Sequence, residues 1–208
     1  GRALHTQGAC AAATLVVEEP VIRPLGVPVF DQPGQTAVLV RLSRGLSLPG
    51  RLPDVLGLAV RIPRAGAGGG DLDLLLSTAS RLPGLGWLPV PRRSFTAGRY
   101  STLAVYRTQA GAVRLIAEPQ GPPVPAVPEA LPAALEVTPL TFHLRAQRRG
   151  GGTWPVATLR LYDTAEDAGL AFDPIWHGHP GLRPGRWQWR LRRMAYAGSR
   201  EGSARAYR

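Results

Sequence analysis

The chain has 208 residues, and 25 basic against 14 acidic residues give it a formal charge of +11. This length allows one domain whose core needs no disulfides. The single cysteine, Cys10, excludes an internal disulfide framework and a cysteine-based zinc site. No apolar run approaches the roughly 18–20 residues of a membrane-spanning helix. The charge favours an anionic partner, such as nucleic acid, a membrane surface or the carboxylates of a cofactor, but scattered surface arginines would give the same total.

Eight segments have the residue types and the alternation of β-strands. They are residues 10–19, 36–43, 56–62, 71–77, 98–107, 111–118, 136–145 and 154–163. Glycine-rich stretches at 65–70 and 149–152 predict turns, and the proline-rich stretch 120–132 predicts a long crossing with a short helix at 129–135. Eight short strands in a chain of this size predict a mainly β protein, built as a barrel or a sandwich.

The C-terminal part of the chain has a different pattern. Residues 164–169 fit one helical turn with Thr164 as its cap, and 174–184 predict a loop. Residues 185–200 contain neither proline nor β-branched residues, which favours a helix that ends near Gly198. In this helix Arg192 and Tyr196 stand four residues apart and share one side. We expect residues 1–163 to form the β core, and residues 164–208 a loop and helix packed on the same domain.

Four blocks, in this order, resemble the haem catalases and their small catalase-like relatives. The first is an Arg-x-x-His stretch at residues 2–5 that leads into a glycine and a strand. The second is TAVLVRLS at 36–43, and the third, within 54–79, contains LGLAVRI and DLDLLLSTA. The fourth runs from 156 to 196, with VATLRLYD, the literal match LAFDP, HPGLRP and an R-x-x-x-Y pattern. The resemblance covers most of the chain, with 100–147 aligned loosely, and implies an eight-stranded antiparallel β-barrel followed by a helix that carries the haem ligand.

On the proximal side, the resemblance implies that Tyr196 ligates the iron of ferric haem b. Arg192, one turn earlier, keeps its positive charge and favours the phenolate form of the ligand. Arg2 and Arg41 match arginines that pair with haem propionates, a task suited to bidentate guanidinium geometry. The family's arginine after the ligand tyrosine does not align cleanly. We take Arg200 for this position and keep Arg205 as the alternative.

On the distal side, the resemblance implies that His5 is the acid and base that moves the protons of the peroxide. Ser43 stands where the family has a serine bonded to the other ring nitrogen of that histidine. The family's distal asparagine is absent, because the chain contains no asparagine. The aligned stretch supplies Ser77 and Thr78 instead. We take Thr78 as the residue that lines the site, with Ser77 as the alternative.

The function implied is that of a haem peroxidase or catalase-like oxidoreductase, with a hydroperoxide as substrate and an unidentified reductant. Without the asparagine we expect weak or no catalase activity. The alternatives are an enzyme that converts fatty-acid hydroperoxides, or a non-catalytic basic barrel that binds an anionic ligand or nucleic acid. The peroxidase interpretation involves no nucleic acid and no membrane span, and it allows a homodimer. No signal sequence opens the chain, so we expect a cytoplasmic protein. Because the chain begins at Gly1 without Met, a processed form or a fragment is an alternative.

A pair of histidines, His177 and His179, resembles a metal-binding pair. Their loop of glycine and proline offers no third ligand nearby in the sequence, so a polar loop is the favoured interpretation.

Overall fold

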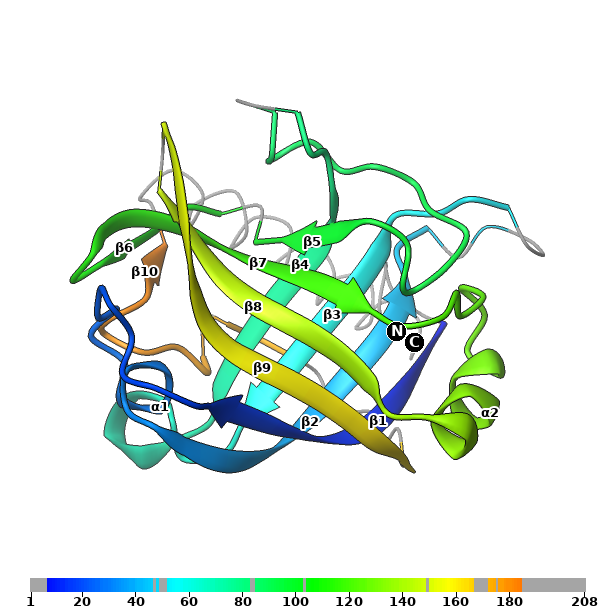
Figure 1. The fold of residues 1–208 in the computed structure, drawn as a ribbon, viewed down its shortest axis with the longest axis horizontal. Coiled ribbons are helices and arrows are strands. Elements are labelled where there is room, and N and C mark those ends of the chain that lie inside the picture. Colours follow the sequence, from blue (N-terminus) through cyan, green and yellow to red (C-terminus); the bar gives the residue numbers. More distant parts are fainter. Residues whose placement is uncertain are drawn as a thin grey trace, which may run out of the picture.

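An antiparallel β-sheet of eight strands closes on itself and forms the centre of the molecule (Figure 1). The structure is a computed structural model, which describes residues 7–46, 48, 52–82, 85–102, 104–148, 150–166, 172–174 and 176–184. Around the ring the strands follow the order β1, β2, β3, β4, β5, β7, β8 and β9, and β9 pairs with β1. The pairing of β7 with β8 closes the sheet. The predicted eight-stranded antiparallel barrel is therefore confirmed.

The ring strands have these bounds: β1 (Gly8–Val17), β2 (Gly34–Arg44), β3 (Leu56–Ile62), β4 (Leu72–Ala79), β5 (Arg99–Ser101), β7 (Gly111–Gln120), β8 (Leu140–Arg148) and β9 (Gly151–Ala165). Two short strands extend the sheet outside the ring, because β6 (Tyr106–Thr108) pairs with β7, and β10 (Arg183–Pro184) pairs with β6. The helices of the described residues are α1 (Pro28–Asp31), α2 (Ala130–Val137) and the 3-10 turn η1 (Ala67–Gly69). None of them is long and apolar enough to cross a bilayer.

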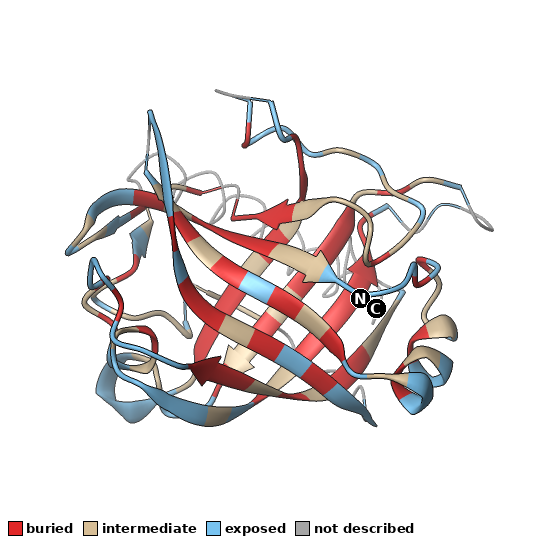
Figure 2. Cartoon of the chain, in the orientation of Figure 1, coloured by how far each residue is buried: buried red, intermediate tan, exposed pale blue. Residues whose placement is uncertain are grey.

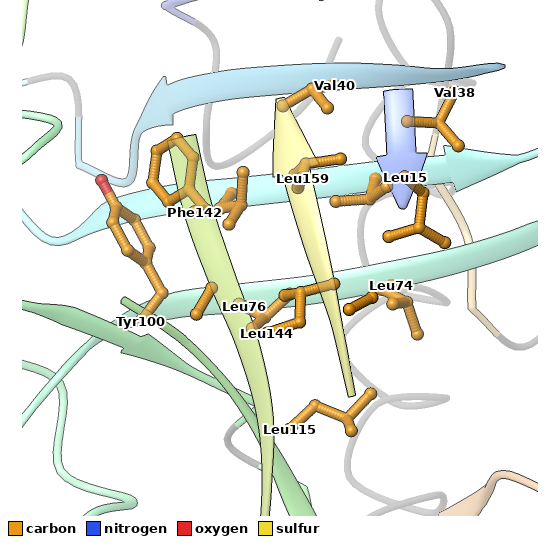
Figure 3. Close-up of a cluster of buried hydrophobic side chains, with 14 of the residues drawn as sticks. Leu15, Val38, Val40, Leu74, Leu76, Tyr100, Leu115, Phe142, Leu144 and Leu159 are labelled. Carbon is orange, nitrogen blue, oxygen red and sulfur yellow. The ribbon is translucent and has the colours of Figure 1, made fainter. Parts of the chain in front are cut away.

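The interior of the barrel is filled by the apolar side chains that alternate along each strand. Figure 3 shows leucines and valines from opposite strands meeting there, with Phe142 and Tyr100 at one end. The rings of these two residues pack edge to face, with centroids 5.9 Å apart. Burial raises the pKa of Tyr100, and its neutral hydroxyl donates a hydrogen bond of 2.8 Å to the Phe95 carbonyl oxygen.

A buried ion pair lies at the end of the barrel where β2 ends. Arg44 follows the inward-facing Leu42 by two residues and is fully buried. Its guanidinium donates to the carbonyl oxygens of Ala126, Leu48 and Leu52, at 2.7, 3.1 and 2.9 Å. The carboxylate of Asp54 lies 3.5 Å from Arg44 Nε and is itself buried. This pair therefore ties the segment after β2 and the segment after β7 to one point at the barrel end.

The structure departs from the predicted elements at several places. Residues 98–107 form two strands, because the Thr102 hydroxyl accepts from Leu115 N and so replaces a backbone acceptor in the ladder. Thr164 was predicted to cap a helix, which is wrong: Thr164 pairs with Ala11, and β9 continues through Ala165. The predicted strand 136–145 begins only at Leu140, because α2 extends to Val137. The predicted C-terminal helix, 185–200, lies outside the described residues.

Replacing Phe142 tests the barrel interior. Phe142→Ala removes a fully buried ring and its contact with Tyr100, so we expect the free energy of unfolding to fall by about 3–5 kcal/mol. The control is Val137→Ala in α2, where the side chain is 83% exposed and we expect a change within about 0.5 kcal/mol. Urea denaturation measures the free energy of unfolding of both variants, and equal m-values show that the change is one of stability. Similar losses of free energy in the two variants would contradict this packing.

Candidate functional site

Small residues form a continuous row across the outer face of five strands. Cross-strand partners run from Gly8 on β1 to Ser43 on β2, Gly57 on β3, Ser77 on β4 and Ser101 on β5. We call these five residues the serine–glycine row. Directly opposed residues in a sheet point to the same side, so the row presents only hydroxyl groups and bare backbone. With strands about 4.8 Å apart, it spans about 19 Å. On this outer face Ser43, Gly57 and Ser101 are buried and Ser77 is half-buried.

An arginine guanidinium lies at the β1 end of this row. Arg41 on β2 is only 4% exposed, although it belongs to the outer face, where it pairs with Cys10 and Ala59. A Cβ atom at Gly8 would lie 2.8 Å from both Cζ and Nη2 of Arg41. The absence of a side chain at Gly8 is therefore what allows the guanidinium to lie against the row. Ser43, next along the row, is also buried.

Of the two distal-position alternatives, only Ser77 faces the same side as Ser43. Thr78 alternates with the inward Leu76, and its cross-strand partner is Tyr100 in the barrel interior. The Thr78 hydroxyl accepts a hydrogen bond of 3.0 Å from Leu56 N and is fully buried. Since Ser77 is on the serine–glycine row and Thr78 on the opposite face, Ser77 is the better candidate to meet a ligand there.

Four residues along β4 from the row, a buried carboxylate anchors the segment that follows β9. Asp73 on the outer face of β4 receives two hydrogen bonds from Arg61 on β3, at 2.8 and 2.7 Å. The same carboxylate accepts from the backbone N–H of Asp173 at 2.7 Å and lies 2.9 Å from Nδ1 of His177. Asp73 N also donates to the His177 carbonyl oxygen. Residues 173 and 177 are thus fixed against the barrel 100 residues beyond Asp73 in sequence.

The charges in this anchor support one another. The bidentate hydrogen bond to Asp73 raises the pKa of Arg61, and the Arg61 guanidinium also lies 5.0 Å from the centre of the Phe172 ring. His179, in the same segment, accepts a hydrogen bond from Gly181 N. Both histidines of the apparent metal pair therefore have structural partners. Within the described ranges no group of three metal-ligating side chains occurs.

Five of the predicted site residues lie outside the described residues. They are Arg2, His5, Arg192, Tyr196 and Arg200. Among the described ones, Arg41 and Ser43 lie together at the β1–β2 edge of the serine–glycine row. Tyr100 is unsuited to be a phenolate ligand, because burial raises its pKa and its hydroxyl is a hydrogen-bond donor.

Comparison with solved structures identifies the barrel. A fungal catalase superposes with a TM-score of 0.69 at 13% identity, over 89% of this chain and 56% of that one. A bacterial catalase superposes with a TM-score of 0.68 at 14% identity, over 89% of this chain and 54% of the other. The chain has the catalase fold. It spans about half the length of the catalases that it matches.

The likeness to catalases is one of structure, because the sequence matches no family model and no curated protein. Sequence reasoning had pointed to Ser43 and Arg41 but missed Gly57 and Ser101. No local signal marks these two, since a serine or glycine in a strand becomes part of a row only through cross-strand register. Asp73 gave a clearer signal, because it is a charged residue among four leucines, at positions 72 and 74–76.

Removing the Asp73 carboxylate tests the anchor. Asp73→Ala leaves Arg61 without its bidentate partner, so we expect the free energy of unfolding to fall by about 3–5 kcal/mol. Asp71→Ala is the matched control, because that carboxylate is 38% exposed and 3.8 Å from Arg61; we expect a loss below about 1 kcal/mol. Equal losses in urea denaturation would show that the Asp73 carboxylate does not stabilise the fold as described.

Proposed function

We propose that this protein is a haem-dependent enzyme that reacts with hydroperoxides, as a peroxidase with weak or no catalase activity. The observation that carries the proposal is the serine–glycine row with Arg41 at its end, on the outer face of a barrel that has the catalase fold. No side chain larger than serine stands in the row, so a planar macrocycle would meet only small side chains there. A buried guanidinium beside the row suits a carboxylate of that macrocycle.

The residues that would hold haem come from both ends of the chain. Arg41, with Arg2, would pair with the propionates. Tyr196 would supply the phenolate that ligates iron, the type of ligand found in catalases. A free phenol has a pKa near 10, so ligation at neutral pH needs a positive neighbour, and Arg192 and Arg200 would provide the charge. When bound, haem supplies an iron centre that exchanges electrons with the hydroperoxide.

The protein's part in the chemistry is the movement of one proton. His5 would take the proton from the oxygen of the hydroperoxide that approaches the iron and return it to the departing oxygen, which favours cleavage of the O–O bond. Ser43, at the β1 end of the row, would hold the other ring nitrogen and so fix the imidazole tautomer. An organic reductant would then complete the peroxidase cycle.

Ser77 rather than asparagine on the serine–glycine row supports peroxidase chemistry over dismutation. A serine hydroxyl is shorter than a carboxamide and has a single donor hydrogen, so it would orient a second peroxide less well. The chain contains no asparagine that could orient the second peroxide from another position. Thr78 points into the barrel and would reach the ligand only through a change of register.

Filling the row tests where haem binds. Ser77 is half-buried on the outer face, so Ser77→Phe places a ring where the macrocycle would lie, and we expect the affinity for haem to fall at least about a hundredfold. Thr78→Val changes the neighbouring residue on the inner face and should leave haem affinity within about threefold. Titration with hemin, followed by absorbance, measures both. If both variants bind as tightly as the wild type, haem does not lie on the row.

Replacing His5 tests the chemistry. His5→Gln removes the proton acceptor, so we expect turnover of hydroperoxide with an organic donor to fall by about 10²–10⁴-fold while the bound haem remains. The wild-type protein should oxidise the donor and release little oxygen. Absorbance confirms equal haem content, and donor oxidation and oxygen release are measured together. Undiminished turnover in His5→Gln, or oxygen release as the main reaction of the wild type, would contradict the proposal.

A further inference from the structure

Exposed apolar side chains are concentrated on two loops, one after β2 and one after β4. Of the eleven large hydrophobic residues exposed among the described residues, seven lie between positions 46 and 52 or between 82 and 88. Leu46, Leu48 and Leu52 lie on the first loop; Leu82, Leu85, Trp87 and Leu88 lie on the second, and we call these four the apolar loop patch. Figure 1 shows the second loop, between β4 and β5, projecting beyond the barrel, and Figure 2 shows it largely exposed. Such a concentration marks an interaction surface.

Hydrogen bonds hold the two loops together at their bases. Asp54 N donates to the Arg92 carbonyl oxygen at 3.0 Å, and Arg92 N donates to the Asp54 carbonyl oxygen at 2.8 Å. The Asp54 carboxylate, buried against Arg44, accepts from the backbone N–H groups of Leu46 and Leu48. The first loop is therefore fixed to the barrel end, and the second loop is fixed to the first.

Two backbone hydrogen bonds lie within the described part of the projecting loop. Leu85 N donates to the Leu82 carbonyl oxygen and Leu88 N to that of Leu85, at 3.1 and 2.9 Å. At the base, Ser80 N bonds to the Leu88 carbonyl oxygen, and Arg99 Nε donates to that of Ser80. The sequence places prolines, which have no N–H, at positions 83, 89 and 91. Each backbone donor that is already bonded, or replaced by proline, lowers the cost of entering an apolar medium, because unsatisfied backbone groups are expensive there.

Basic residues flank the apolar tip, and acidic residues are absent. Between Asp73 and Glu118 the sequence holds six arginines and no acidic residue. Arg81 and Arg93 are exposed and stand before and after these apolar residues in the sequence, with Arg93 at the base of the loop, where its carbonyl oxygen accepts from Ala126 N. Leucine and tryptophan at a tip with arginine behind them form the combination that binds the interface of an anionic bilayer. A second copy of this chain is disfavoured, because the same arginines would face each other across the contact.

We propose that the apolar loop patch attaches the protein to the surface of membranes that contain anionic lipid. Leu82, Leu85, Trp87 and Leu88 enter the boundary between headgroups and acyl chains, and Arg81 and Arg93 contact the phosphates. The attachment is peripheral and reversible, since no more than the loop tips enter the bilayer. It does not depend on haem, so its test and the test of the proposed function fail separately.

The test is co-sedimentation of the full chain with vesicles of phosphatidylcholine alone or mixed with phosphatidylglycerol. We expect binding to the mixed vesicles that weakens as salt is raised, and little binding to phosphatidylcholine alone. Trp87→Ser combined with Leu88→Ser should weaken binding to mixed vesicles at least about tenfold. Trp176→Ser combined with Val137→Ser is the matched control, because both side chains are exposed away from the patch; its binding should equal that of the wild type.

Arg81→Gln combined with Arg93→Gln tests the charge without touching the apolar tip, and should weaken binding about tenfold or more. This pair also keeps the test decisive if the serine variants fail to fold, which circular dichroism would show. The proposal is overturned if the wild type stays in solution with mixed vesicles, or if a folded Trp87→Ser, Leu88→Ser variant binds them fully. It is equally overturned if light scattering finds a dimer that this variant dissociates while no vesicle binding occurs.

Discussion

Closure of the sheet by the pairing of β7 with β8 is the constraint on which the other features depend. Once the ring is closed, alternation divides the side chains of every strand between a sealed interior and an outer face. The interior takes the leucines, valines and aromatic rings that provide most of the stability. Polar residues such as Ser43 and Arg41 can then be buried on the outer face without entering the core. The barrel is thus the support, and the proposed haem site lies on its outside.

The Asp73 anchor connects this support to the end of the chain. Its carboxylate is bonded to Arg61 within the sheet and to residues 173 and 177 beyond it. Those residues precede the stretch in which the family resemblance places the ligand tyrosine. A rigid attachment at this point would serve the proposed haem site, which draws on distant parts of the sequence, because a ligand must be held within a fraction of an ångström of its productive position. The proposed function therefore relies on the contact of Asp73 with residues 173 and 177, which no local sequence motif predicts.

Sequence patterns predicted the strands well, because a period of two persists through most of them. They could not supply what depends on register. Ser77 and Thr78 are neighbours in sequence, yet one lies on the outer face and the other inside, and a slip of one residue would exchange them. The bonds from Asp73 to residues 173 and 177 were likewise beyond prediction, since tertiary packing alone brings these positions together. His5 and Tyr196 rest on the resemblance to catalases and stay predictions.

The absorption spectrum of the wild-type protein, produced with haem supplied, tests the central claim most directly. The account predicts a Soret band of ferric haem at one haem per chain, in a form that is lost in Tyr196→Phe and kept in Tyr162→Phe, whose ring lies exposed on β9. A wild-type protein that remains colourless with haem in excess would contradict the account. It would leave a basic barrel of the catalase fold whose outer face serves a different ligand.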